Sequence, residues 1–239
     1  MVQFIKTPVW AAVVVIFTGF SFAYAFEKPS FDCSNASAPD EYAICRNAEL
    51  SKLDWLMNSG YRFLLQRLGK KTANKIHLPF FRARQECGSD ESCIRDVQLS
   101  EIPSFTALGF KLDPPLRDNA SRSPSYEQLK RMIRVGECTS SVIRETSYRL
   151  CSPDENGVCI PEADSGSSVE LENGIYGVSY ESVDAINHSQ SGDPVVACLI
   201  EVPQDCPPGD DRGYVWGVDN LRTHEHWDLP DSQHGCGGA

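Results

Sequence analysis

Several common catalytic and metal-binding motifs are missing from this sequence of 239 residues. It contains no G-x-S-x-G, H-E-x-x-H or C-x-x-C pattern, which are signatures of serine hydrolases, zinc proteases and cysteine zinc sites. Basic residues are scarce, with 22 Lys and Arg against 33 Asp and Glu. Because duplex binding depends on clustered cations, this balance argues against a nucleic-acid partner. With no catalytic constellation, the sequence predicts a protein that is not an enzyme and needs no cofactor.

The first 25 residues are predicted to be a secretory signal peptide. Lys6 is the only charge, and residues 8–22 are almost entirely apolar. Ala23-Tyr24-Ala25 has the small residues that a signal peptidase recognises, so cleavage is expected before Phe26. The apolar stretch is shorter than the roughly 20 residues of a spanning helix, and an uncleaved anchor is the alternative. We therefore expect a periplasmic or secreted protein without stable membrane insertion after cleavage.

All ten cysteines follow this segment. An even number of cysteines in an oxidising compartment predicts disulfides rather than metal ligands. Pairs that are close in sequence are favoured, and the two cysteines left over form the last pair. The predicted pairs are Cys33–Cys45, Cys87–Cys93, Cys151–Cys159, Cys198–Cys206 and Cys138–Cys236.

The mature chain is predicted to contain two domains. Residues 110–125 hold three prolines and many small polar residues, which is typical of a linker. The preceding domain, 26–109, is close to neutral. The following domain, 126–239, carries most of the acidic excess, because residues 111–239 have 22 acidic and 10 basic side chains.

The first domain is predicted to be helical. Ser37 followed by Pro39 is a typical helix start, with the serine hydroxyl as the cap. Apolar residues then recur every three or four positions, which places them on one buried helix face. They are Leu50, Leu53, Met57, Tyr61, Leu64 and Leu68. Gly69 is expected to end this helix, and further helices are predicted near 79–86 and 93–102.

The second domain is predicted to be β-rich. Strands are expected near 142–150 and, as a nearly continuous apolar run, near 194–202. Asn173-Gly174 predicts a tight hairpin turn, and a second hairpin is expected between 214–218 and 224–229. We therefore predict an α+β fold, in which a small disulfide-held helical domain precedes a small β-barrel or sandwich.

The first domain also contains a set of motifs with a specific spacing. They are Pro29–Cys33 (PSFDC), Glu41–Cys45 (EYAIC), Leu50–Asp54 with Asn58 and Tyr61, Arg84–Cys87 and Glu91–Ile94. Together, over about residues 31–102, they resemble the bacterial LprI-type lysozyme-inhibitor N-terminal domain. The chain departs from that family at Phe80 and Phe81, where a tryptophan often precedes the third cysteine. The resemblance implies a helical, disulfide-held domain of an exported bacterial protein and, by the family's name, lysozyme inhibition.

Motifs in the second domain carry less information. Residues 164–168 (DSGSS), 205–213 (DCPPGDDRG), 220–223 and 231–239 are similar to an uncharacterised C-terminal module of proteobacterial secreted proteins. Ser165-Gly166 is also similar to the Ser-Gly loop that another periplasmic inhibitor family inserts into lysozyme. The Trp-Lys-Gly segment expected downstream in that family is absent.

The tail is the best candidate for a metal site. His224-Glu225-His226 could present two imidazoles on one side of a strand, with His234 nearby. The alternative, an exposed hairpin with outward polar residues, is favoured, so no metal is expected.

These observations favour a binding protein. The leading hypothesis is a periplasmic protein that contacts a protein partner, with lysozyme as the first candidate, through Arg46, Lys52 and Arg62 on the polar side of the long helix and its loops. The acidic second domain would speed encounter with a basic lysozyme. A structural or interaction protein of the cell envelope is the alternative, and an unrecognised hydrolase is the third hypothesis. The oligomeric state does not follow from the sequence.

Overall fold

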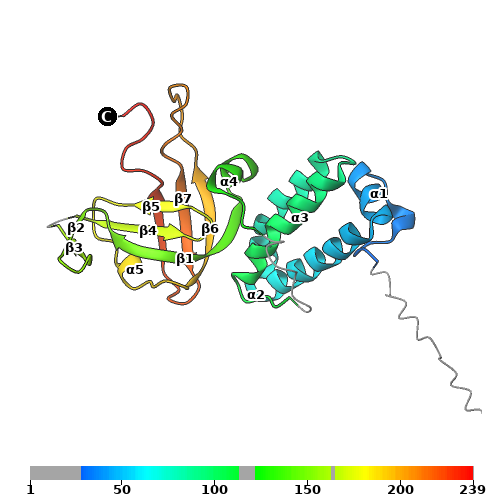
Figure 1. Ribbon diagram of the computed structural model, residues 1–239, viewed down its shortest axis with the longest axis horizontal. Coiled ribbons are helices and arrows are strands. Elements are labelled where there is room, and N and C mark those ends of the chain that lie inside the picture. Colours follow the sequence, from blue (N-terminus) through cyan, green and yellow to red (C-terminus); the bar gives the residue numbers. More distant parts are fainter. Residues whose placement is uncertain (1–27, 113–121, 163–164, 239) are drawn as a thin grey trace, which may run out of the picture.

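The computed structural model describes residues 28–112, 122–162 and 165–238. The predicted signal peptide at 1–25 and the middle of the predicted linker, 113–121, lie outside the described residues. The elements are η1 (Cys33–Asn35), α1 (Pro39–Arg46), α2 (Ala48–Glu86), α3 (Glu91–Thr106), α4 (Tyr126–Met132), β1 (Cys138–Tyr148), β2 (Cys151–Pro153), β3 (Cys159–Pro161), β4 (Ser167–Leu171), β5 (Tyr176–Val178), α5 (Asp184–Asn187), β6 (Pro194–Glu201), β7 (Val215–Asn220) and β8 (His226–Pro230). The α+β class is confirmed, with a helical N-terminal part and a β-rich C-terminal part (Figure 1).

Helices α2 and α3 begin at side-chain caps and pack against each other. The Asn47 side chain accepts hydrogen bonds from the first backbone N–H groups of α2, and Asp90 does the same for α3. Helix α1 begins at Pro39 as predicted, but Ser37 is not its cap. The cap residue is Ala38, and the Glu41 carboxylate accepts hydrogen bonds from the backbone N–H groups of Ser37 and Ala38.

The predicted end of the long helix at Gly69 is confirmed, although a second helical segment within α2 follows directly. Gly69 has φ 77° and ψ 164°, and the chain reverses there, because Asp54 before the break contacts Arg84 after it. The second helical segment continues to Glu86. The helix predicted near 79–86 therefore begins earlier than expected. Pro79 lies inside it and is buried. The predicted apolar face is confirmed, because Leu53, Met57 and Leu64 are all buried in the helical core.

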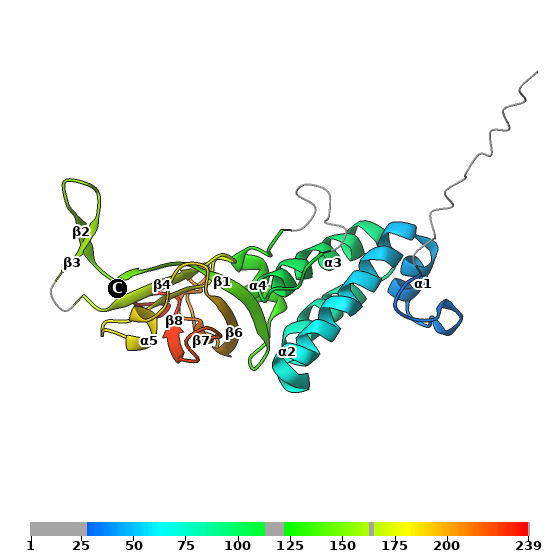
Figure 2. The ribbon, with the colours of Figure 1, turned by 90° about the horizontal axis from the view of Figure 1, so that it is seen from below.

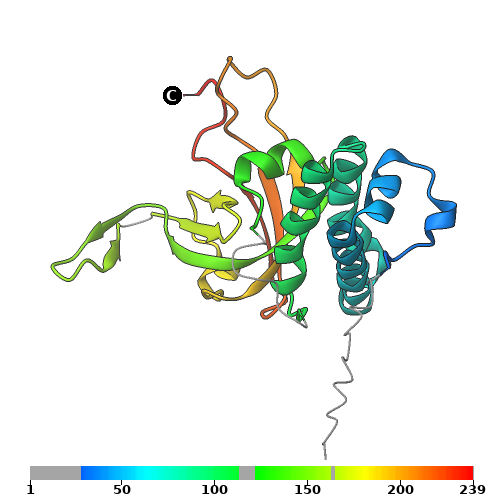
Figure 3. The ribbon, with the colours of Figure 1, turned by 45° about the vertical axis from the view of Figure 1, so that its right-hand side comes forward.

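The C-terminal part is a curled antiparallel sheet of six strands with the form of a half-barrel. Its strand order is β5-β4-β1-β6-β7-β8, which puts the apolar β6 beside β1 at the centre. The predicted Asn173-Gly174 turn joins β4 to β5, and the second predicted hairpin is formed by β7 and β8. Strands β2 and β3 pair only with each other and form an arm that projects away from the sheet (Figures 2 and 3).

The two faces of the sheet are covered by different cores. On β6, Val195, Ala197 and Leu199 point into a core that is closed by α4 and α5. The alternate residues Val196 and Cys198 point the other way and pack with α2 and α3. This period of two is the ordinary alternation of a strand, and it allows one strand to join the helical and β-rich parts of the chain.

Polar contacts reinforce this junction. The Arg82 guanidinium of α2 donates from Nη1 and Nη2 to both carboxylate oxygens of Glu137, at 2.5 and 3.0 Å, and from Nη2 to the Met132 carbonyl. The Ser140 hydroxyl of β1 donates to the Ser104 carbonyl of α3 at 2.6 Å. The helices are therefore held against the sheet by hydrogen bonds as well as by apolar burial.

Five disulfides are present, and three of the predicted pairs are confirmed. These are Cys33–Cys45, Cys87–Cys93 and Cys151–Cys159. The predicted pairs Cys198–Cys206 and Cys138–Cys236 are wrong, because Cys138 is bonded to Cys198 and Cys206 to Cys236. The reason is the sheet register, which places Cys138 of β1 directly opposite Cys198 of β6.

Candidate functional site

The three cations predicted to contact a partner all lie on the surface of the helical part. Lys52 and Arg62 belong to the exposed side of α2, and Arg46 ends α1. Within the described residues, no salt bridge joins any of them to a carboxylate. The Arg46 guanidinium lies 5.9 Å from the ring centre of Tyr42, which is also exposed. All three charges are therefore accessible to a partner.

Trp55 is a candidate contact residue that the sequence reasoning missed. Its side chain is 48% exposed, whereas tryptophan is highly buried on average. It follows Lys52 by three residues and precedes Arg62 by seven, so the three side chains lie along one side of α2. The spacing that places Leu50 and Leu53 in the core also places Trp55 outside it. We call Lys52, Trp55 and Arg62 the α2 outer face.

A buried charge network lies on the opposite side of the helical part. The Arg84 guanidinium donates to Asp40 at 2.9 Å and to Asp54 at 3.0 Å. Both carboxylates are almost fully buried. The remaining Asp54 oxygen accepts a hydrogen bond from the backbone N–H of Ser30 at 2.7 Å. Because both Asp54 oxygens are occupied, this network is suited to fixing α1 against α2 rather than to general base chemistry.

The partly buried His77 and the buried Glu101 form a second pair beside this network. The His77 Nδ1 lies 2.7 Å from the Glu101 carboxylate, and the ring lies near those of Tyr61 and Phe81. Burial opposes the charged imidazole, but Glu101 outweighs it and raises the pKa of His77. Burial raises the pKa of Glu101. A cavity of about 240 Å³ lies alongside, lined in part by His77, Asp54 and Arg84.

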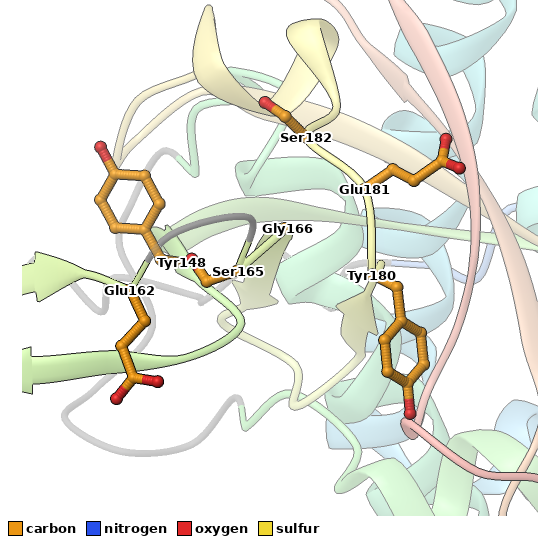
Figure 4. A pocket seen from close by; sticks show the side chains of 7 residues that line it. All are labelled: Tyr148, Glu162, Ser165, Gly166, Tyr180, Glu181 and Ser182. Carbon is orange, nitrogen blue, oxygen red and sulfur yellow. The ribbon is translucent and has the colours of Figure 1, made fainter.

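A larger pocket, of about 470 Å³, lies at the base of the β2–β3 arm (Figure 4). Its lining residues are Tyr148, Glu162, Ser165, Gly166, Tyr180, Glu181 and Ser182. The Glu162 and Glu181 side chains point in different directions in Figure 4. This pocket therefore does not present the converging carboxylates that a glycosidase requires.

The Ser165-Gly166 segment does not protrude like an inserting loop. Ser165 is 5% exposed, and Gly166 is buried with φ +69°. A Cβ atom on Gly166 would lie 2.1 Å from the Ser179 carbonyl oxygen, so the backbone is tightly packed there. The similarity to the Ser-Gly loop of the other inhibitor family is therefore not accompanied by an exposed loop.

The tail histidines are not gathered around one point. His226 contacts Asp219 and Asp228, at 2.8 Å from each, while Glu225 contacts His188 instead. His234 lies beside the Tyr180 ring. In the described ranges 28–112, 122–162 and 165–238, no group of three or more His, Cys, Asp or Glu side chains has an arrangement that could hold a metal ion.

His226 leads to a pH-dependent prediction. Burial opposes its charge, but the hydrogen bonds to Asp219 and Asp228 outweigh burial and raise the pKa above 6.5. Protonated His226 should stabilise the β7–β8 hairpin fully below that value, and the contribution should be lost as pH rises through the raised pKa. We expect His226→Gln to lower the unfolding free energy by less than about 1 kcal/mol near pH 5.5 and by nothing near pH 9.

Urea denaturation of both proteins across this pH range measures the difference. His224→Gln is the control, since His224 is exposed on the same tail segment and takes part in no salt bridge among the described residues. An imidazole of His226 that titrates at or below its ordinary value, followed by NMR, would contradict the assignment.

The comparisons with known proteins identify no relative. No protein-family model, no curated protein and no solved structure matches the chain. The similarity to the LprI-type domain therefore stays a prediction. Five disulfides are typical of a protein that matures outside the reducing cytoplasm. Among the described helices, none combines the length and the apolar character needed to cross a bilayer.

Proposed function

We propose that this protein is an exported, periplasmic binding protein that acts by protein–protein contact, with lysozyme as its first candidate target. The observation that carries the proposal is the α2 outer face, where an exposed tryptophan lies between two cations without intramolecular carboxylate partners in the described residues. Tryptophan and arginine are the residue types most enriched among residues that dominate binding energy. The resemblance of residues 31–102 to the LprI-type domain is the reason for proposing lysozyme as the target.

The chemistry of the α2 outer face suits a cleft that contains carboxylates. In this proposal the Trp55 ring supplies apolar contact area, while Lys52 and Arg62 meet acidic groups on either side. Truncation of one partner in such a buried charge pair costs about 2–5 kcal/mol. Lysozyme cleaves glycosidic bonds with acidic side chains in its cleft. A protein bound in that cleft would keep the cell-wall substrate out of it.

The acidic second half has a separate role in the proposal. Its excess of carboxylates would attract a basic lysozyme from a distance and raise the association rate, an effect that salt screens. Binding should therefore slow as salt increases, whereas contacts of Trp55 should mainly determine the dissociation rate.

Binding of the full mature chain to a panel of basic and neutral lysozymes tests the proposal. Trp55→Ala should weaken binding roughly 30-fold, as expected for a dominant contact residue, and should lower inhibition of cell-wall lysis in parallel. Leu78→Ala is the matched control, because Leu78 is 47% exposed on the same helix. Titrations at about 50 and about 200 mM salt separate the long-range electrostatic attraction, which salt screens, from the short-range contacts of the α2 outer face.

Two results would contradict the proposal. The first is no binding to any lysozyme in the panel at micromolar concentrations. The second is equal loss of affinity in Trp55→Ala and Leu78→Ala. Either result would favour the alternative, a structural or interaction protein of the cell envelope without lysozyme activity.

A further inference from the structure

The β2–β3 arm is a preorganised projection. Its two strands are joined by the Cys151–Cys159 disulfide. At the tip, the Asp154 carboxylate accepts hydrogen bonds from the backbone N–H groups of Asn156 and Val158, both at 2.8 Å. The ladder continues past the strands, because the Asp154 N–H donates to the Val158 carbonyl. A segment ordered in this way loses little conformational entropy when it binds.

One face of the arm carries three exposed apolar side chains. Residues that lie opposite each other in an antiparallel pair share a face, and Ser152 lies opposite Ile160. The alternation of strand side chains then places Leu150 and Val158 on the same face as Ile160 and the disulfide on the other face. The exposed fractions of these residues are 40% for Leu150, 56% for Val158 and 50% for Ile160.

Exposed apolar area is concentrated at this place. Ten large hydrophobic side chains are exposed among the described residues, and half of them lie on the arm or at its base. These five are Tyr148, Leu150, Val158, Ile160 and Tyr180. Contiguous apolar patches of this kind mark interaction sites, whereas single exposed apolar residues need no explanation.

The charge of the arm indicates which kind of partner binds to it. Residues 150–162 contain Asp154, Glu155 and Glu162 but no Lys or Arg. The neighbouring Arg149 turns back toward the body of the protein, with its guanidinium 4.3 Å from the Tyr180 ring centre and bonded to the Ser165 carbonyl. Two copies of this acidic arm would repel each other, so the charge favours a cationic partner over a second copy of the chain.

We propose that the β2–β3 arm inserts into an apolar cleft of a cationic protein. Val158 and Ile160 are the apolar anchors, and Glu155 and Glu162 meet Lys or Arg side chains at the rim of that cleft. This contact surface lies on the other half of the chain from the α2 outer face and does not require lysozyme to be the target.

The test measures binding of the full mature chain to three immobilised cationic proteins of different folds: a basic lysozyme, pancreatic ribonuclease and cytochrome c. The variant Val158→Ser with Ile160→Ser removes the anchors without adding charge. Its matched control is Val135→Ser with Ile200→Ser, two residues that are 56% and 42% exposed elsewhere. We expect at least one probe to lose roughly tenfold or more in affinity for the anchor variant and none for the control.

A second pair of variants tests the charge. Glu155→Gln with Glu162→Gln should weaken the same interaction and reduce its salt dependence. The exposed carboxylates Glu172 and Glu201 provide the charge-matched control when both are replaced by glutamine. A third variant, in which residues 151–159 are replaced by Asn-Gly, removes the arm, and its circular dichroism spectrum checks that the sheet remains folded.

Several outcomes would overturn the inference. They are the absence of binding to all three probes, unchanged binding after removal of the arm, and equal losses in the anchor variant and its control. A dimer in sedimentation that is lost with the arm would assign the arm to self-association instead. Loss of binding in Trp55→Ala alone would support the proposed function while overturning this inference, so the two are distinguishable.

Discussion

Replacing Arg84 by alanine is expected to lower the free energy of unfolding by about 3–5 kcal/mol at pH 7. The Arg84 guanidinium is the only cation in the described residues that forms salt bridges with Asp40 and Asp54. Both carboxylates are almost inaccessible to water, with side-chain exposures of 1% and 4%. Truncation would leave two buried charges without a partner, which is far more costly than the pair itself is favourable. Urea denaturation followed by circular dichroism measures the loss.

An exposed ion pair provides the control for this prediction. Arg144 and Glu170 are 44% and 39% exposed, so Arg144→Ala should cost less than about 1 kcal/mol. Adding Asp40→Asn and Asp54→Asn to Arg84→Ala should recover part of the loss, because neutral amides need no counter-ion. A loss for Arg84→Ala no greater than that for Arg144→Ala would show that the network contributes little to stability.

Removal of the Cys138–Cys198 disulfide is expected to have a similarly large effect. The two cysteines are 60 residues apart in sequence, and closing a loop of that length stabilises the folded state by about 4 kcal/mol on a chain-entropy account. The bond also lies where β1 and β6 meet the helical core. We expect Cys138→Ala with Cys198→Ala to lower the urea midpoint accordingly, as measured by the fluorescence of the buried Trp216 and Trp227.

The arm disulfide is the matched control. Strands β2 and β3 pair only with each other, so Cys151→Ala with Cys159→Ala should loosen the arm while leaving the tryptophan-detected midpoint nearly unchanged. A smaller shift for the Cys138–Cys198 variant than for the arm variant would contradict the assignment of the central disulfide to the cooperative core.

Local order could be predicted from the sequence, whereas long-range pairing could not. The Leu50–Leu68 periodicity, the Asn173-Gly174 turn and three disulfides of short sequence separation depend on neighbours in the chain, and all of them are confirmed. The Cys138–Cys198 bond depends on the register between β1 and β6, which is set by packing of the whole sheet. Sequence proximity favoured Cys206 as the partner of Cys198, but the strand register decided otherwise.

The candidate sites also divide into those that follow from local sequence and those that depend on long-range packing. The exposure of Lys52 and Arg62 follows from helical periodicity, and the same periodicity would have identified Trp55. The Arg84 network joins side chains that are 44 and 30 residues apart in the sequence. No local sequence pattern therefore predicts it. Gly69 is predicted as a helix end from its residue type, and its positive φ does end the first segment of α2. The sequence does not predict that a second segment starts there and folds back, with Arg84 beside Asp54.

The connectivity of the central disulfide has a consequence for the order in which the protein matures. Cys151 and Cys159 lie between Cys138 and Cys198 in the chain, and the two bonds are nested. A chain that emerges N-terminus first and oxidises its cysteines in order of appearance would join Cys138 to Cys151. Native pairing then requires thiol–disulfide exchange, in which a thiolate attacks the wrong bond and releases Cys138. A host that supplies a disulfide isomerase is therefore the suitable one for producing this protein.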